Sequence, residues 1–324
     1  MIAPTSTAAR LWFVAQWAGV VITLVLLAGL VVRPQTSLDI LWNVLIQLVP
    51  ASLLVTPLLW RNVCPLATLN LVSKRFGAAR KLPDGWLLPA GAVGILLLVV
   101  LVPARRFVFN TDGTLLAVTI AAVAVLALVL GALFDAKAGF CNSICPVLPV
   151  ERLYGQSPLL RLSNPRCAPC TMCTSRGCID LAPGHSIPHT LGEARRSSGW
   201  LLSGYGAFAA AFPGFILGYG TLADGPLSTA AGVYLHIAMW CLGSYLVVAA
   251  LTLVLRLSSA VALVAIGAAA AGLYYWFAAA AIGAAFELPA SVPVIRTMAF
   301  VLVAVWAMKA LPETRRAVAA SAGH

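Results

Sequence analysis

The chain has 324 residues, of which 61% are hydrophobic and only 10% are charged. Soluble domains carry about 25% charged residues, so this composition excludes a water-soluble globular enzyme and a disordered chain. The formal net charge of +11 would fit a nucleic-acid-binding domain, but Lys and Arg also accumulate in the cytoplasmic loops of membrane proteins. We therefore expect a polytopic membrane protein that contacts the lipid bilayer and binds no nucleic acid.

The apolar segments predict an all-α membrane protein. A helix needs about 20 mostly apolar residues to cross the hydrocarbon core, and no segment shows the alternating pattern of a barrel strand. The first apolar run is too long for the core of a secretion signal and is expected to be retained. About eight transmembrane helices are predicted, at residues 11–32, 38–59, 86–103, 114–134, 200–220, 231–255, 258–285 and 292–311.

The basic residues predict the orientation of these helices. If the N-terminus is cytoplasmic, most of the 21 basic residues face the cytoplasm, and only Arg33, Arg105, Arg106 and Arg296 lie on the other side. This arrangement follows the positive-inside rule. We expect an inner-membrane, multi-pass protein whose two termini and long central loop are cytoplasmic.

The predicted spans divide the chain into three regions. Residues 1–134 form an N-terminal four-helix membrane region with a cytoplasmic loop at 60–85. Residues 135–199 form a cytoplasmic loop with six of the eight cysteines. Residues 200–324 form a C-terminal four-helix membrane region with a basic tail. The chemistry of the protein is expected in the cysteine-rich loop.

The strongest motif in that loop is a C-x2-C-x2-C run formed by Cys167, Cys170 and Cys173. A cytoplasmic loop is in a reducing compartment, which disfavours a disulfide framework. Zinc modules use two separated C-x2-C pairs, whereas ferredoxins use three cysteines at successive x2 spacing. The run therefore predicts a [4Fe–4S] cluster, with zinc or a redox dithiol as the alternatives.

A second motif, C-x3-C-P, is formed by Cys141, Cys145 and Pro146. It matches the last two cysteines of the bacterial ferredoxin run, in which the fourth cysteine ligates the other cluster. By this logic Cys145 completes a first cluster with the three cysteines of the run, and Cys141 belongs to a second. Cys178 follows the run at a longer spacing and lacks the proline.

The C-x3-C-P motif has an internal echo near residue 60. The segment 59–66, which contains Cys64 and Pro65, resembles the segment 140–147. Each follows an even-numbered span at the same membrane face. The two helix pairs are therefore expected to be duplicated, and Cys64 is expected to approach Cys141.

These motifs resemble those of the ferredoxin-type polytopic membrane iron–sulfur proteins of the NapH, NosR and CcoG kind. The resemblance covers residues 60–183 and implies a cytoplasmic ferredoxin-like insert that passes electrons in a respiratory chain. The chain departs from that pattern because its first C-x3-C-P is reduced to Cys64-Pro65, only one C-x2-C-x2-C run is present, and Cys178 is shifted.

Counting ligands leaves the second cluster open. Two all-cysteine [4Fe–4S] clusters need eight thiolates, and the expected cytoplasmic face offers seven. The first cluster is complete with Cys145, Cys167, Cys170 and Cys173. The second has Cys141, Cys178 and Cys64, so that it is a three-iron cluster, takes Asp180 or His185 as a ligand, or is absent.

Two further residues within the predicted spans deserve an interpretation. His236 would suit a hydrogen bond to a quinone carbonyl, but a histidine satisfied by a carbonyl of a neighbouring helix is the better interpretation. Cys241 is expected to be a small packing residue. A quinone is thus a candidate ligand without a defined site.

The sequence predicts a membrane-bound iron–sulfur electron-transfer subunit rather than a complete enzyme. Electrons would pass between a cytoplasmic-side [4Fe–4S] centre and quinone or a partner redox protein of a respiratory complex. The alternatives are an assembly or maturation factor that reduces metal for a respiratory oxidase, and a membrane redox sensor. No nucleotide-binding loop or catalytic dyad is visible.

Overall fold

The structure, a computed structural model, describes residues 7–71, 80, 82–134, 137–162, 179–180 and 183–320. Within these ranges it is helical and contains no β-strand, which confirms the predicted all-α class. The N-terminal half contains α1 (Thr7–Val32), α2 (Pro34–Ile40), α3 (Ile46–Val55), α4 (Pro57–Val63), α5 (Pro65–Asn70), α6 (Leu87–Ala104) and α7 (Gly113–Leu133). The remainder contains α8 (Leu148–Tyr154), α10 (Pro183–Leu191), α11 (Gly204–Gly220), α12 (Ala230–Val254), α13 (Ser259–Ala285) and α14 (Val292–Ala320).

Seven helical segments in the described part of the chain are long and apolar enough to cross a membrane. Two of them contain a π-helical turn, η1 (Leu41–Leu45) and η4 (Arg105–Phe109). The segments are Arg10–Val32, Pro34–Val55, Leu87–Phe109, Gly113–Leu133, Leu227–Val254, Ser259–Ala285 and Pro289–Glu313. These seven correspond to seven of the eight predicted spans.

The predicted span 200–220 is the exception. Helix α11 has only 17 residues, which is at the lower limit for crossing the hydrocarbon core. It begins late because Ser203 caps it by accepting a hydrogen bond from the backbone N–H of Gly206, and the preceding residues form a tight 3₁₀ turn. Helix α11 packs between α12 and α13, and Gly214 lies against the backbone of Trp240.

The second predicted span, 38–59, is displaced towards the N-terminus. The helix ends at Val55 because Thr56 is extended, with φ −165° and ψ 114°. A residue that precedes a proline is disfavoured in the helical region, and Pro57 then begins the separate helix α4. Helix α4 therefore carries Arg61 away from the span and delivers Cys64 at its C-terminal end.

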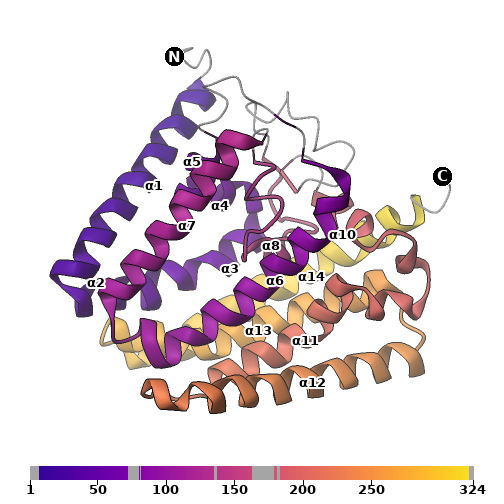
Figure 1. Ribbon diagram of the computed structural model, residues 1–324. Helices are drawn as coiled ribbons and strands as arrows, with labels where there is room; N and C mark the ends of the chain where they lie inside the picture. Colours follow the sequence, from indigo (N-terminus) through magenta and orange to yellow (C-terminus); the bar gives the residue numbers. More distant parts are fainter. Residues whose placement is uncertain are drawn as a thin grey trace.

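The helices run between two ends of the bundle (Figure 1). We call one the cysteine end; it holds residues 57–71, 137–162, 179–180 and 183–203. The other, the far end, holds residues 33–45, 105–113 and 220–230. At the far end, the Trp42 indole donates to the carbonyl of Phe109 and the Gly225 N–H donates to that of Arg106. Figure 1 shows α1 and α7 together on one flank and α11, α12 and α13 on the other.

Candidate metal centre

Three cysteines from two distant segments meet at the cysteine end. Cys64, Cys141 and Cys145 share one small cluster whose buried core includes Ala67, Ala127, Phe140 and Cys141. Each of the three is a free thiol, and Cys141 is buried. The described residues thus bring Cys64 into the same cluster as Cys141, as the internal echo predicts.

The segment that holds Cys141 and Cys145 is a tight series of turns. The Asn142 N–H donates to the carbonyl of Lys137 at 2.9 Å, and the Cys145 N–H donates to that of Phe140 at 3.0 Å. Gly139 and Gly94 let this segment press against α7 and α6, because a Cβ at Gly139 would lie 2.4 Å from the carbonyl oxygen of Leu130. The turns therefore hold both thiols between two membrane helices.

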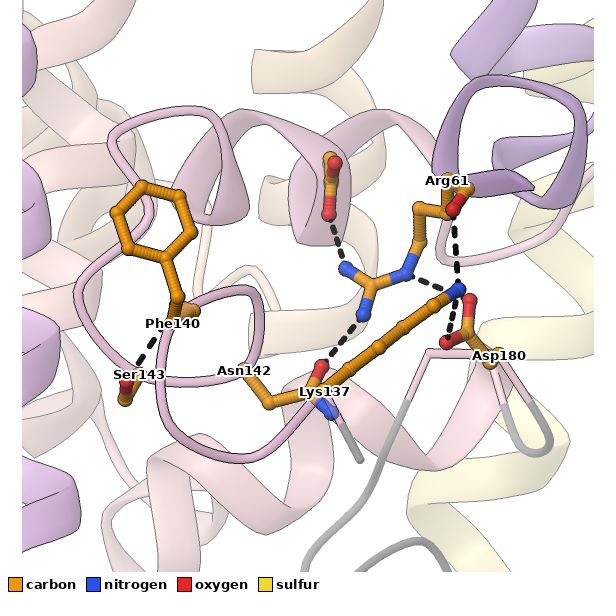
Figure 2. A network of polar contacts seen from close by, with 7 residues as sticks. Arg61, Lys137, Phe140, Asn142, Ser143 and Asp180 are labelled. Atoms are coloured by element: carbon orange, nitrogen blue, oxygen red, sulfur yellow. Dashed lines mark hydrogen bonds and ion pairs between the residues drawn. The ribbon is translucent and has the colours of Figure 1, made fainter. Parts of the chain in front are cut away.

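A buried network of charges joins the same segments (Figure 2). The Arg61 guanidinium donates to Asp180 Oδ1 at 2.6 Å, to Asn142 Oδ1 at 2.6 Å and to Glu151 Oε2. The Lys137 ammonium donates to Asp180 Oδ2 at 3.2 Å and to the carbonyl oxygen of Arg61 at 3.0 Å. These four charged side chains are at most 3% exposed.

The network links the segments around Cys64 and Cys141 to the residues that follow Cys178. Arg61 precedes Cys64 by one helical turn, Asn142 follows Cys141 directly, and Asp180 lies two residues after Cys178. Burying a charge is costly unless it is paired and hydrogen-bonded, and here two cations face two carboxylates. Burial alone would raise the pKa of Asp180, but the charges of Arg61 and Lys137 outweigh it and lower that pKa to about 2.

On the cysteines, unlike on Asp180, the effect of burial outweighs that of the neighbouring charges. It raises the pKa of Cys141 to about 12, although Arg61 and Lys137 lower it in part. Burial also raises the pKa values of Cys64 and Cys145. The three thiols are therefore protonated at neutral pH in the metal-free protein, and a bound metal would displace their protons.

Both ends of the segment that contains the C-x2-C-x2-C run are fixed in this region. Before the run, the N–H groups of Leu159 and Leu160 donate to the carbonyls of Leu54 and Val55, where α3 ends. Lys309 of α14 also donates to the carbonyls of Pro158 and Leu159, at 2.7 and 2.9 Å. After the run, Ile179 and Asp180 are buried. The residues between these two points start and finish at the cysteine end.

The remaining predicted ligands lie outside the described residues. These are Cys167, Cys170, Cys173 and Cys178. Within the described ranges, no group of three His, Cys, Asp or Glu side chains is arranged to hold a metal ion. The alternative ligand Asp180 already uses both carboxylate oxygens for Arg61 and Lys137.

His236 and Cys241 of α12 lie away from the cysteine end. The Nε2 atom of His236 accepts a hydrogen bond from the Trp240 indole at 3.1 Å and lies 3.1 Å from the Thr221 hydroxyl. The histidine is therefore satisfied by side chains rather than by the expected carbonyl. Cys241 packs against the main core, which agrees with the packing role predicted for it.

The sequence did not identify the charge network. Arg61 and Lys137 were part of the general positive bias, and Glu151 had no assigned role. A signal was nevertheless present, since Glu151 and Asp180 belong to a chain with only ten acidic residues. An acid next to a cysteine motif in such a chain is a candidate for a buried ion pair.

The helices define this chain as a multi-pass α-helical membrane protein. No protein-family model, curated protein or solved structure matches it.

Proposed function

We propose that this chain is an iron–sulfur electron-transfer subunit of a respiratory membrane complex, located in the inner membrane with the cysteine end in the cytoplasm. It would pass electrons between a [4Fe–4S] centre at the cysteine end and quinone or a partner redox protein. One cluster would use Cys145, Cys167, Cys170 and Cys173, and a second would use Cys64, Cys141 and Cys178.

One observation carries the proposal. Cys64, Cys141 and Cys145 occupy one cluster at the end of the bundle where the segment with the C-x2-C-x2-C run begins and ends. Seven cysteines would thereby be available within one region, and three successive x2-spaced cysteines are typical of iron–sulfur ligation. The concentration of basic residues at this end supports the cytoplasmic orientation.

The cysteines of this region are of the residue type that would hold such a group. Cysteine thiolates are the protein ligands of iron–sulfur clusters, and Arg61 and Lys137 place positive charge near the Cys141 thiol. A bound cluster would accept and release single electrons. The chain itself would supply the thiolates, exclude water from them by burial, and fix the two cysteine-bearing segments through Arg61.

The position of the centre would also suit exchange with the membrane. Cys64 follows the end of a candidate span at Val55 by only nine residues, with the single helix α4 between them. A centre at Cys64 would therefore lie near the bilayer surface, where a quinone headgroup or a partner subunit can approach.

Metal analysis of protein purified without oxygen tests the proposal. Iron and acid-labile sulfide are expected, with an electron paramagnetic resonance signal after reduction. Cys170→Ser should abolish the signal, whereas Cys241→Ser should leave it unchanged because that thiol lies in the main core. Stoichiometric zinc without sulfide would contradict the proposal.

A second experiment tests the orientation. A thiol label needs an exposed position at the cysteine end. Ser198 is exposed there, whereas Ser157 is buried and hydrogen-bonded to Glu313. A cysteine for labelling is therefore introduced as Ser198→Cys. Labelling should require a membrane-permeant reagent. Labelling from the periplasmic side would reverse the proposed topology.

Co-purification separates this function from the alternatives. An electron-transfer subunit should be isolated with a stoichiometric respiratory partner. A transient association with an oxidase would instead favour a maturation factor.

A further inference from the structure

The two π-helical turns, η1 and η4, meet at the far end. Such turns are rare and are frequently found at functional sites, and here each lies in a different candidate span. The Trp42 indole of η1 donates to the carbonyl of Phe109 in η4 at 3.4 Å. The Arg105 guanidinium of η4 lies 5.0 Å from the centre of the Trp42 ring. The two irregular turns therefore place an arginine against a tryptophan within the membrane-spanning part of the chain.

Arg105 has no counter-charge among the described residues. No carboxylate of that part of the chain lies within ion-pair distance of it, and Asp224 binds Arg106 and Asn110 instead. The Nη1 atom of Arg105 donates to the Tyr219 hydroxyl at 3.0 Å, whereas its buried Nε has no partner. A charge within a candidate span is costly without a partner and indicates a functional site.

Tyr219 of α11 holds both arginines of η4 in place. Its hydroxyl accepts from Arg105, and its carbonyl oxygen accepts from Arg106 at 2.9 Å. The Arg106 guanidinium also lies 4.4 Å from the centre of the Tyr219 ring. The half-buried Arg105 guanidinium is thus fixed by a ring and a hydroxyl and still has N–H groups to donate. A planar guanidinium held in this way suits the two-point binding of phosphate oxygens.

We propose that Arg105, between Trp42 and Tyr219, binds the phosphate of an anionic phospholipid headgroup. This site is separate from the proposed electron transfer and does not depend on it. The phosphate would supply the negative charge that Arg105 lacks, whereas a zwitterionic headgroup also brings a positive charge of its own.

The place of the site favours a lipid over a soluble anion. Arg105 lies four residues before the end of the candidate span Leu87–Phe109, and a cation near the end of a span reaches the level of the headgroups. Tryptophan and tyrosine are enriched at the same level. Exposed apolar side chains lie nearer the middle of both spans, Ile46 after η1 and Val100 before η4. They would contact the acyl chains of a lipid held at Arg105.

Thermal unfolding of the full chain in a neutral detergent tests the proposal, with increasing amounts of phosphatidylglycerol or phosphatidylcholine. A ligand that binds the folded state raises the melting temperature, and the wild type should be stabilised at a lower concentration of phosphatidylglycerol than of phosphatidylcholine. Arg105→Gln should raise the phosphatidylglycerol concentration that gives half of this stabilisation about tenfold, because hydrogen bonds to a charged group are lost.

Two further variants control for charge and for folding. Arg33→Gln removes the same charge from an exposed side chain at the same end, and it should change the half-stabilising concentration by at most about twofold because salt screens exposed charges. Arg105→Lys keeps the charge but lacks the planar guanidinium. It should need more phosphatidylglycerol than Arg33→Gln, and it decides the matter if Arg105→Gln does not fold.

Inorganic phosphate, compared with chloride at equal ionic strength, distinguishes a lipid from a soluble anion. It should give no stabilisation that depends on Arg105. Stabilisation by phosphate that is lost in Arg105→Gln would assign the site to a soluble anion and overturn the proposal.

Two other results would also overturn it. One is equal stabilisation of the wild type by the two lipids. The other is an equal half-stabilising concentration in Arg33→Gln and the Arg105 variants that fold, because the lipid would then respond only to overall charge. None of these measurements depends on iron or sulfide, so their outcome is independent of the test of the proposed function.

Discussion

The two ends of the helix bundle differ in how deeply their basic side chains are buried. At the cysteine end, Arg61 and Lys137 are at most 3% exposed and bind Glu151 and Asp180. At the far end, the Arg106–Asp224 ion pair has a similar separation of 2.8 Å, but its side chains are 15% and 39% exposed. Ion pairs of similar length thus lie in environments of very different polarity.

Aromatic rings take the place of buried carboxylates at the far end. The Arg105 guanidinium lies 5.0 Å from the ring centre of Trp42, and that of Arg106 lies 4.4 Å from the ring of Tyr219. Such cation–π contacts suit side chains whose apolar stems lie along the protein while the charged group reaches the membrane interface. Aromatic residues are also enriched at that interface.

The comparison shows what each kind of charge does for the fold. A buried ion pair is costly to break because the remaining charge stays in a medium of low polarity, whereas an exposed pair can exchange its partner for water. The cysteine end therefore depends on each member of its network, and the far end tolerates the loss of one.

The largest expected effect on stability is that of Arg61→Met. Loss of the guanidinium leaves Glu151 and Asp180 buried without the group that binds both. Breaking such a buried pair lowers the free energy of unfolding by about 3–5 kcal/mol. Arg106→Met at the far end is the matched control; it removes an ion pair worth about 0–1 kcal/mol and a hydrogen bond to the Tyr219 carbonyl, so it should cost less than Arg61→Met. Thermal unfolding in detergent measures both. Equal losses at the two ends would contradict the comparison.

The second-largest expected effect is a loss of stability in acid, caused by protonation of Asp180 at the cysteine end. The pKa of Asp180 is lowered from 3.8 to about 2 in the folded chain, so its carboxylate stabilises the fold above about pH 4. This contribution is lost as the pH falls towards 2, and one such carboxylate is worth about 2–3 kcal/mol. Melting temperatures measured between these pH values should fall more steeply for the wild type than for Asp180→Asn. If the melting temperatures of the two proteins fell equally with pH, Asp180 would not be the group that stabilises the fold.

A smaller loss is expected from Gly131→Ala in α7. A Cβ there would lie 2.4 Å from the carbonyl oxygen of Asn70, in the helix that follows Cys64, and overpacking of this kind costs about 1–3 kcal/mol. Gly243→Ala is the control, because nothing lies within 4 Å of a Cβ at Gly243. That change should be neutral or stabilising, since alanine favours a helix. Thermal unfolding should therefore separate the two variants.

The sequence predicted most of the membrane helices because their length and apolarity are local properties. The fourth predicted span, 114–134, differs from the observed Gly113–Leu133 by one residue at each end. The errors came from signals weaker than hydropathy. The extended residue Thr56 before Pro57 ends α3 before the predicted position. The cap at Ser203 begins α11 after the predicted position.

The candidate site was predictable only in part. The internal echo predicted that Cys64 approaches Cys141, because equivalent positions in duplicated helix pairs lie at the same membrane face. The partners of Arg61 were not predictable, since Glu151 and Asp180 lie 90 and 119 residues away in the chain. No local pattern indicates such a pairing, which arises only when α4, α8 and the turns around Asn142 come together.

The smallest expected loss of stability is that of Asp224→Asn at the far end, and its dependence on salt tests whether the two ends differ in electrostatic environment. The carboxylate binds Arg106 and accepts a hydrogen bond from Asn110, but it is 39% exposed, so its loss should cost at most about 1 kcal/mol. The screening length falls from about 10 Å at 0.1 M salt to about 3 Å at 1 M. The difference in melting temperature between Asp224→Asn and the wild type should therefore shrink at the higher salt concentration. The difference caused by Glu151→Gln should persist, because ions do not enter the region in which Glu151 and Arg61 are buried. If salt reduced both differences equally, the two ends would share one electrostatic environment and the distinction between them would fail.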